Sequence, residues 1–134
     1  MKKLSIQNRI ENLEKVAEFV ELFGEEHGLD SKTSFELNLI LDELVTNIIN
    51  YAYDDEDKHI IEIVLEKSNN TINIQTIDDG EEFNPLKKNE VNVKASLEDR
   101  KIGGLGIHIV KQKTDDISYE RKEGRNILNL IKKL

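Results

Sequence analysis

The 134-residue sequence contains no cysteine and no tryptophan, a single proline, and only 5% aromatic residues. The absence of cysteine excludes disulfide bonds, thiolate chemistry and metal sites built on thiolates. No stretch approaches the about 20 consecutive apolar residues that a membrane-spanning helix needs, and the first residues hold no apolar run of signal-peptide length. We therefore expect a cytoplasmic protein with no membrane partner.

Positive charge is also scarce, with 19 Lys plus Arg against 27 Asp plus Glu and a net charge of -8. Non-specific nucleic-acid binding depends on basic patches, so the charge argues against that class. Hydrophobic residues at 37% with 34% charged residues are typical of a folded globular protein. We expect one domain over residues 1–134, which would hold any phosphate compound with backbone N–H groups and a metal ion.

The stretch from Phe35 to Tyr53 organises the rest of the chain. Apolar residues recur in it at three- and four-residue steps, which predicts a helix with one buried face and with Ser31 or Ser34 as its N-terminal cap. This predicted core face consists of Leu37, Leu41, Leu44, Val45, Ile48, Ile49 and Ala52.

Glu43, Asn47 and Asn50 form a polar column on a different face of the same helix. Such a column is usually only the solvated side of an amphipathic helix. In a functional interpretation, Asn47 offers a neutral oxygen to Mg²⁺ while Glu43 accepts a proton beside it. The helix alone does not distinguish the two interpretations.

Hydrophobic periodicity predicts the remaining elements. We expect a strand over residues 3–9 and a helix that ends at His27-Gly28, with Ile10, Leu13, Val16, Ala17, Val20 and Phe23 on its apolar stripe. Two hairpins are predicted, turned at Asn69-Asn70 and at Glu123-Gly124. The acidic run at 54–57 lacks the glycine and distal glutamate of a calcium loop and is interpreted as an exposed loop. Residues 84–102 lose all periodicity and are interpreted as a lid.

Two glycine-containing motifs flank this predicted lid. Asp78-Asp79-Gly80 is either an ordinary turn or a site where a carboxylate accepts the exocyclic amine proton of adenine. Gly103-Gly104-Leu105-Gly106 is either a flexible joint or a helix N-terminus that presents N–H groups to phosphate. The second motif lacks the Lys-Ser or Lys-Thr pair of a Walker loop, and it does not directly follow a strand as a dinucleotide fingerprint does.

Taken together and in order, these motifs resemble the ATP-binding domain shared by histidine kinases, type II topoisomerases, ninety-kilodalton heat-shock chaperones and mismatch-repair ATPases. The chain most resembles the stand-alone anti-sigma-factor serine kinases. In that branch Glu-x-x-x-Asn is the N box, here Glu43 to Asn47. Asp-x-Gly is the first glycine box, here Asp78 to Gly80, and Gly-Gly-Leu-Gly-Ile is the second, here Gly103 to Ile107.

The resemblance implies an α/β two-layer sandwich of the Bergerat type, with a mixed, largely antiparallel sheet and helices on one face. It implies that Glu43 is the general base and Asn47 the Mg²⁺ ligand. The implied nucleotide-binding residues are Asn47, Asp78, Gly80, Gly103, Gly104, Leu105, Gly106 and Asn126. Arg100 and Lys101 are either solvated lid charges or contacts to phosphate or partner.

By the same resemblance, the protein is expected to be an ATP- and Mg²⁺-dependent serine/threonine kinase and a homodimer. It would phosphorylate a small anti-sigma-factor antagonist in a partner-switching circuit, with a sigma factor as a further candidate partner. The alternative is a nucleotide-gated module that sequesters a regulator without chemistry, and only Glu43 favours the enzyme. His27, His59 and His108 do not fit the phosphoacceptor of a histidine kinase, which stands on a separate dimerisation helix.

Overall fold

The computed structural model describes residues 1–84, 86 and 105–134, and the side chains of 105 and 106 are not described. The predicted lid, with Arg100 and Lys101, lies almost wholly outside the described residues. The elements in chain order are β1 (Lys2–Gln7), a 3-10 turn (Ile10–Asn12), α1 (Leu13–His27), α2 (Ser31–Tyr51), β2 (Ile60–Ser68), β3 (Thr71–Asp78), α4 (Leu105–Lys113), β4 (Asp116–Lys122) and β5 (Arg125–Lys133).

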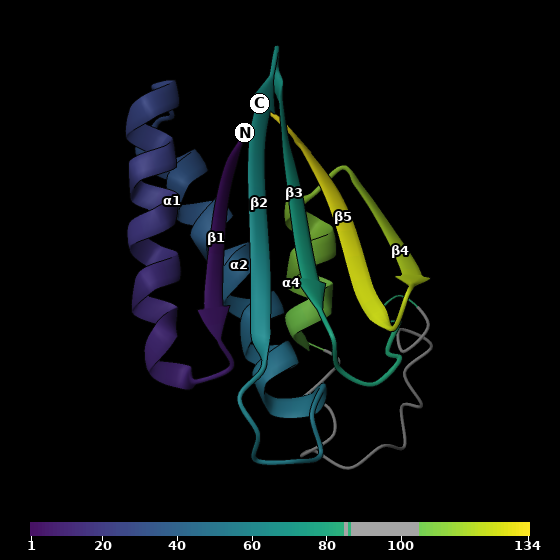
Figure 1. Cartoon of the computed structure of the whole chain (residues 1–134). Helices are drawn as coiled ribbons and strands as arrows, with labels where there is room; N and C mark the ends of the chain where they lie inside the picture. Colours follow the sequence, from purple (N-terminus) through teal and green to yellow (C-terminus); the bar gives the residue numbers. More distant parts are fainter. Residues whose placement is uncertain (85, 87–104) are drawn as a thin grey trace.

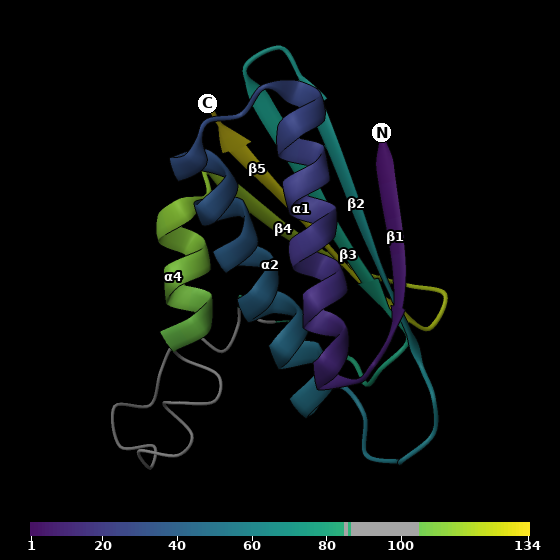
Figure 2. The ribbon, with the colours of Figure 1, turned by 90° about the vertical axis from the view of Figure 1, so that its left-hand side faces the viewer.

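The five strands form one sheet in the order β1-β2-β3-β5-β4. Helices α1, α2 and α4 lie side by side on one face of this sheet, and none of the described helices lies on the opposite face (Figure 1, Figure 2). The predicted two-layer sandwich is therefore confirmed. All four strand pairings are antiparallel, so the parallel pairing of a mixed sheet does not occur among the described strands.

Both predicted hairpins are confirmed, and their turns explain why the chain reverses where it does. Asn69 has φ +53° in the β2–β3 turn, while Glu123 and Gly124 have φ +53° and +76° in the β4–β5 turn. Asn tolerates this left-handed backbone better than most residues, and Gly adopts it without steric cost. Tight turns then place alternate side chains of each hairpin on the helix-facing side.

The core lies between the helices and the sheet, with α2 in the middle of the helical layer (Figure 2). Leu37, Leu41, Leu44, Val45 and Ala52 are buried, as the apolar face predicted. Ile48 and Ile49 are half-buried and pack against the core. The sheet contributes alternate residues, namely Ile61, Ile63 and Leu65 from β2, Ile72 and Ile74 from β3, and Leu128 and Leu130 from β5.

The predicted cap of α2 is wrong. Ser31 is the first helical residue, and the cap is Asp30, whose Oδ1 accepts a hydrogen bond from the backbone N–H of Thr33 at 2.7 Å. Asp30 has the extended backbone (φ -73°, ψ 167°) that a capping residue requires. The side chains of Asp and Ser cap equally well, so the sequence did not reveal which of these neighbours is the cap.

The predicted stripe of α1 is correct at Val16, Val20 and Phe23, which are buried, but wrong at its start. Ile10 belongs to the separate 3-10 turn and is 54% exposed, and Ala17 is exposed as well. The predicted end of α1 is confirmed, because Gly28 caps it with φ +63°. None of the described helices has the length and apolar character that a membrane span requires.

Candidate functional site

A cavity of about 40 Å³ lies where the C-terminal half of α2 meets the ends of β3 and β5. It brings together Asn47, Asp78 and Asn126, which the resemblance had assigned to nucleotide binding. Most of the wall is apolar or aromatic. The lining residues are Leu44, Asn47, Ile48, Tyr51, Ala52, Thr76, Asp78, Phe83, Tyr119, Asn126 and Leu128.

Asp78 is the last residue of β3 and is 5% exposed. Its Oδ1 accepts two hydrogen bonds of 2.9 Å, one from the Gly80 N–H and one from the Asn126 side chain. Neither bond uses Oδ2. Burial raises the pKa of Asp78, although the two hydrogen bonds oppose this effect. The result is an oriented carboxylate in the wall of an apolar cavity.

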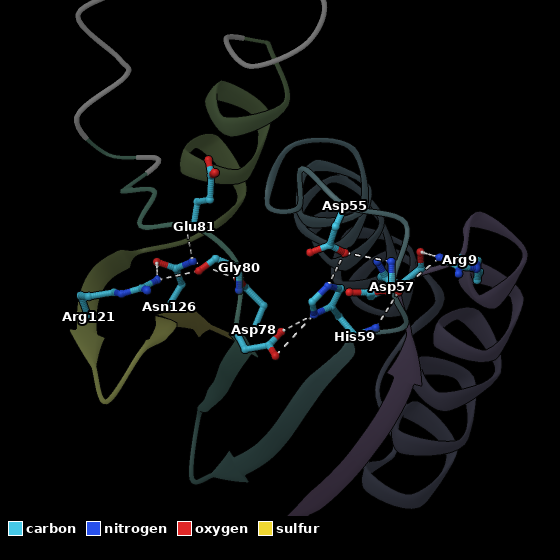
Figure 3. Close-up of polar contacts among 11 residues, drawn as sticks. Arg9, Asp55, Asp57, His59, Asp78, Gly80, Glu81, Arg121 and Asn126 are labelled. Atoms are coloured by element: carbon cyan, nitrogen blue, oxygen red, sulfur yellow. Dashed lines mark hydrogen bonds and ion pairs between the residues drawn. The ribbon is translucent and has the colours of Figure 1, made fainter.

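Asn126 holds Asp78 from the neighbouring strand, because the two residues are direct partners in the β3–β5 register. Its amide nitrogen donates to Asp78 Oδ1 and to the Glu81 carbonyl oxygen at 2.7 Å. Its Oδ1 accepts from the Phe83 N–H at 3.2 Å and from the Tyr119 hydroxyl at 2.5 Å. The same oxygen accepts from Arg121 Nη1 at 3.1 Å, and Figure 3 shows Arg121 beside Asn126. Both groups of the carboxamide are thus used within the chain.

Tyr119 and Arg121 belong to this network, and sequence reasoning missed both. Arg121 Nη1 also donates to the Gly80 carbonyl oxygen at 2.8 Å, and the Glu81 N–H donates to the Ala52 carbonyl oxygen at 2.8 Å. The turn after β3 is therefore tied to β4 on one side and to the end of α2 on the other. Only the β4–β5 register brings these β4 side chains to the site, and no sequence motif marks them.

Glu43 lies one helical turn before Asn47 on α2, is half-buried, and does not line the cavity. Among the described residues, none forms a hydrogen bond with its carboxylate. Burial, and then the charge of Asp42, raises its pKa, which makes it a stronger base than an exposed glutamate. Asn50, the third member of the predicted column, is exposed and does not line the cavity.

The second glycine motif is described only in part. Gly103 and Gly104 lie outside the described residues, whereas Leu105 and Gly106 form the first turn of α4. This turn lies at the same end of the molecule as the ends of α2 and β3 (Figure 1). A helix N-terminus at that end presents free N–H groups and the positive end of its dipole, both of which favour phosphate.

Within the described part of the chain, no three His, Asp or Glu residues are arranged to hold a metal ion. The acidic run at 54–57 is an exposed loop, as predicted. Mg²⁺ commonly binds through one or two protein oxygens together with substrate phosphates and water. The carboxamide of Asn47 beside the cavity fits that kind of site, in which a nucleotide completes the coordination.

The chain matches the family of histidine kinase-like ATPase domains over residues 6–132. It belongs to this family. The serine/threonine-protein kinase BtrW of Bordetella bronchiseptica is 26% identical over 100 residues, which are 75% of this chain and 70% of BtrW. The predicted family is confirmed, together with the similarity of this chain to a serine/threonine-protein kinase.

Solved structures share the fold at low sequence identity. The RsbU and RsbW domains of Rv1364c from Mycobacterium tuberculosis align with 100% of this chain at a TM-score of 0.66 and 14% identity, but this chain spans only 33% of that protein. A chain of the SiaB–SiaC complex from Pseudomonas aeruginosa aligns at a TM-score of 0.58 and 13% identity, with 98% of this chain and 89% of the matched chain covered. The catalytic domain of the histidine kinase ThkA aligns at a TM-score of 0.56 and 15% identity, with 99% of this chain and 97% of the ThkA domain covered.

Proposed function

We propose that this protein binds ATP with Mg²⁺ and transfers the γ-phosphate to a serine or threonine of a small protein antagonist. The observation that carries the proposal is the buried carboxylate of Asp78 in the wall of an apolar cavity beside Asn47. Family membership supports ATP as the ligand, and the similarity to BtrW supports a hydroxyl group of a protein as the acceptor.

Adenine suits this cavity in both shape and hydrogen bonding. Its flat ring has apolar faces, which Leu44, Ile48 and Leu128 can contact. Its exocyclic amine donates hydrogen bonds, and Oδ2 of Asp78 is an acceptor that the bonds from Gly80 and Asn126 leave unused. Guanine carries a carbonyl oxygen at that position, which a carboxylate would repel. The proposed site therefore selects ATP over GTP.

The residues of α2 and α4 would act on the triphosphate. Asn47 would hold Mg²⁺ through its side-chain oxygen, and the bound ion would offset the charge of the phosphates. The N–H groups at Leu105 and Gly106 begin α4 and, with Gly103 and Gly104, would bind the phosphate oxygens.

Glu43 would act as the general base of the transfer. It would take the proton from the acceptor hydroxyl as that oxygen forms a bond to the γ-phosphorus and the bond to the β–γ bridging oxygen breaks. ADP then leaves with the bridging oxygen. Half-burial of Glu43 suits this role, because a raised pKa makes the carboxylate a better proton acceptor.

The acceptor is proposed to be an anti-sigma-factor antagonist, within a partner-switching circuit in the cytoplasm that includes a sigma factor. In that circuit the kinase would work as a homodimer. The protein–protein complex of SiaB with SiaC, among the proteins of similar fold, supports a protein partner.

Transfer from γ-labelled ATP to a small protein encoded beside this one tests the proposal. We expect label on serine or threonine of that protein, with Mg²⁺ required. Calorimetry provides the parallel measurement, in which EDTA should weaken ATP binding strongly, because no Lys or Arg is among the described residues that line the cavity. ATP binding with no transfer to any candidate antagonist would favour the sequestering module instead.

A further inference from the structure

A second cluster lies on the other side of the turn that carries Asp78, and the proposed reaction does not use it. His59 precedes β2 and stands between two carboxylates (Figure 3). Its Nε2 lies 2.8 Å from Asp55 Oδ1, and its Nδ1 lies 3.3 Å from Asp79 Oδ1. The ring of Tyr53 stacks on the imidazole at a centroid distance of 4.0 Å and an interplanar angle of 11°.

This arrangement favours the protonated form of His59. A neutral imidazole has one N–H and one lone pair, so one of its nitrogens would turn a lone pair toward a carboxylate. The imidazolium donates from both nitrogens and places a positive charge over the face of the Tyr53 ring. In agreement, the hydrogen bond with Asp55, followed by the contact with Asp79, raises the pKa of His59 above its ordinary value of 6.5.

The charged surroundings of the ring are predominantly acidic. Arg9, after β1, donates to the Glu56 carbonyl oxygen at 3.5 Å and so holds the backbone of the loop. Tyr53 follows the end of α2, and burial of its hydroxyl, together with the nearby carboxylates of Asp78 and Asp79, raises its pKa. The ionisable groups that contact the His59 ring are Asp55, Asp79 and Tyr53, and the other charged residues of its own loop are Asp54, Glu56, Asp57 and Lys58.

Asp79 connects this cluster to the cavity, because it lies between Asp78 and Gly80 in the chain. Asn126 and Arg121 hold that turn from the β4–β5 side. His59 holds Asp79 from the opposite side, where the loop between α2 and β2 passes. The backbone that orients the Asp78 carboxylate is therefore fixed from two directions.

We propose that His59 is a positioning residue for the carboxylate of Asp78, that it acts through Asp79, and that protonated His59 strengthens nucleotide binding. The inference rests on the proposed function, since it concerns the orientation of the residue that reads adenine. It adds a residue outside the three family motifs and a dependence on pH above the ordinary histidine pKa.

Loss of the His59 proton would affect the site in two ways. The turn would keep its bonds to Arg121, Asn126 and the Ala52 carbonyl oxygen but would lose the ion pair at Asp79, so Asp78 would be held less firmly. The charge of Asp79, which already raises the pKa of Asp78, would also lose its counter-charge. The pKa of His59 is raised in the folded protein, so the strengthening of nucleotide binding should be complete below pH 6.5, the ordinary histidine pKa. It should be lost as the pH rises through the raised pKa of His59.

Calorimetric titration with Mg²⁺ and ATP at about pH 6 and about pH 8.5, on either side of the ordinary histidine pKa, tests the inference. His59→Gln removes the charge, and His27→Gln is the matched control at the end of α1. The ratio of wild-type to variant affinity at each pH cancels the ionisation of ATP itself. We expect this ratio for His59→Gln to be about twofold to fivefold at the lower pH, the range for a partly exposed ion pair, and near one at the higher pH.

Asp79→Asn provides a second route that leaves His59 and its contact with Asp55 in place. Asp79→Asn should lower the pKa of His59, which is measured from the imidazole proton resonances. It should also reduce the pH dependence of ATP affinity, as His59→Gln does. Linkage is reciprocal, so saturating ATP should raise the pKa of His59 in the wild type by about 0.5. His27→Gln should reproduce the wild-type profile.

A His59→Gln affinity that is lower by the same factor at both pH values would indicate only a structural role and would overturn the inference. So would an unchanged His59 pKa in the presence of bound ATP. Both outcomes leave ATP binding intact and therefore spare the proposed function. Absence of ATP binding at either pH would overturn the proposed function, and this inference with it.

Discussion

Gly80 lies directly against Ala52, so that a Cβ at position 80 would stand 2.5 Å from both the Cβ and the carbonyl oxygen of Ala52. The same carbonyl oxygen accepts the Glu81 N–H at 2.8 Å. The glycine of the Asp-x-Gly motif is therefore required by packing, because it lets the turn after β3 dock on the end of α2. Asn47 of α2 and Asp78 of β3 reach the same cavity because of this contact.

Gly80→Ala is expected to separate the two elements locally, because the Ala52 backbone cannot move without disturbing α2. We expect a loss of about 1–3 kcal/mol in the free energy of unfolding, as for other overpacked sites, and a larger loss of ATP affinity. Urea unfolding and calorimetry measure the two effects. Gly28→Ala is the control, since it strains a positive φ in open space far from the site and should lower stability alone. Normal ATP affinity in Gly80→Ala would show that the contact does not shape the site.

Asp78→Asn is expected to remove the preference for adenine. The variant carboxamide would present either a donor or a weaker neutral acceptor to the exocyclic amine, and an unmatched buried polar group costs about 1–3 kcal/mol, or roughly tenfold to hundredfold in affinity. Titrations with ATP and GTP give the result directly. Asp116→Asn, on the exposed edge of β4, is the matched control. A folded Asp78→Asn protein that still prefers ATP would reduce Asp78 to a turn residue.

The nucleotide-free form of the same variant should be no less stable than the wild type near neutral pH. Burial raises the pKa of Asp78 in the folded protein above 3.8, its value in the unfolded chain. The stability that the bound proton provides is therefore complete below pH 3.8 and is lost as the pH rises through the pKa of the folded state. An amide avoids that loss. Thermal unfolding of both proteins across this window should show a difference that moves in favour of Asp78→Asn as pH rises. A constant difference would mean that the carboxylate is not desolvated.

Buried Lys132 and half-buried Glu36 form an ion pair that ties α2, α4 and β5 together at the end opposite the cavity. Lys132 is 8% exposed, and its Nζ donates to Glu36 Oε2 at 2.7 Å and to the Lys113 carbonyl oxygen at 3.0 Å. Lys132→Met should lower the free energy of unfolding by about 1–3 kcal/mol, because it leaves the half-buried Glu36 charge unpaired, while the double variant with Glu36→Leu should recover most of that loss. Urea unfolding of the two variants decides the matter. Equal losses would show that the pair carries no coupling.

The sequence predicted those parts of the fold that depend on local pattern. Alternating apolar residues, such as Ile61, Ile63 and Leu65 in the first hairpin, and turn residues at Asn69 and Gly124 were enough to predict both hairpins. The roles of Arg121 and His59 depend on the register of distant strands and on the path of the α2–β2 loop, so no local pattern could reveal them. The cap at Asp30 was missed because adjacent Asp and Ser residues give the same signal.

The site was predicted to a similar extent. The family resemblance pointed to Asn47, Asp78 and Asn126, and the structure brings all three to one cavity. The sequence did not reveal that the carboxamide of Asn126 is fully used in holding Asp78 and the following turn, since those hydrogen bonds depend on backbone groups whose positions only the folded chain defines. The predicted role of Gly103 and Gly104 lies outside the described residues.

The most direct test of a kinase that uses Glu43 as its base is single-turnover phosphate transfer to the partner by Glu43→Gln. The glutamine keeps the size and reach of the side chain but cannot accept a full proton, so transfer should fall by about 10²–10⁴-fold while ATP affinity hardly changes. Asn47→Ala serves as the contrasting variant and should lower affinity and transfer together. Full transfer by Glu43→Gln would contradict the mechanism, and changes within about 0.5 kcal/mol for both variants would mean that they form only the solvated side of α2.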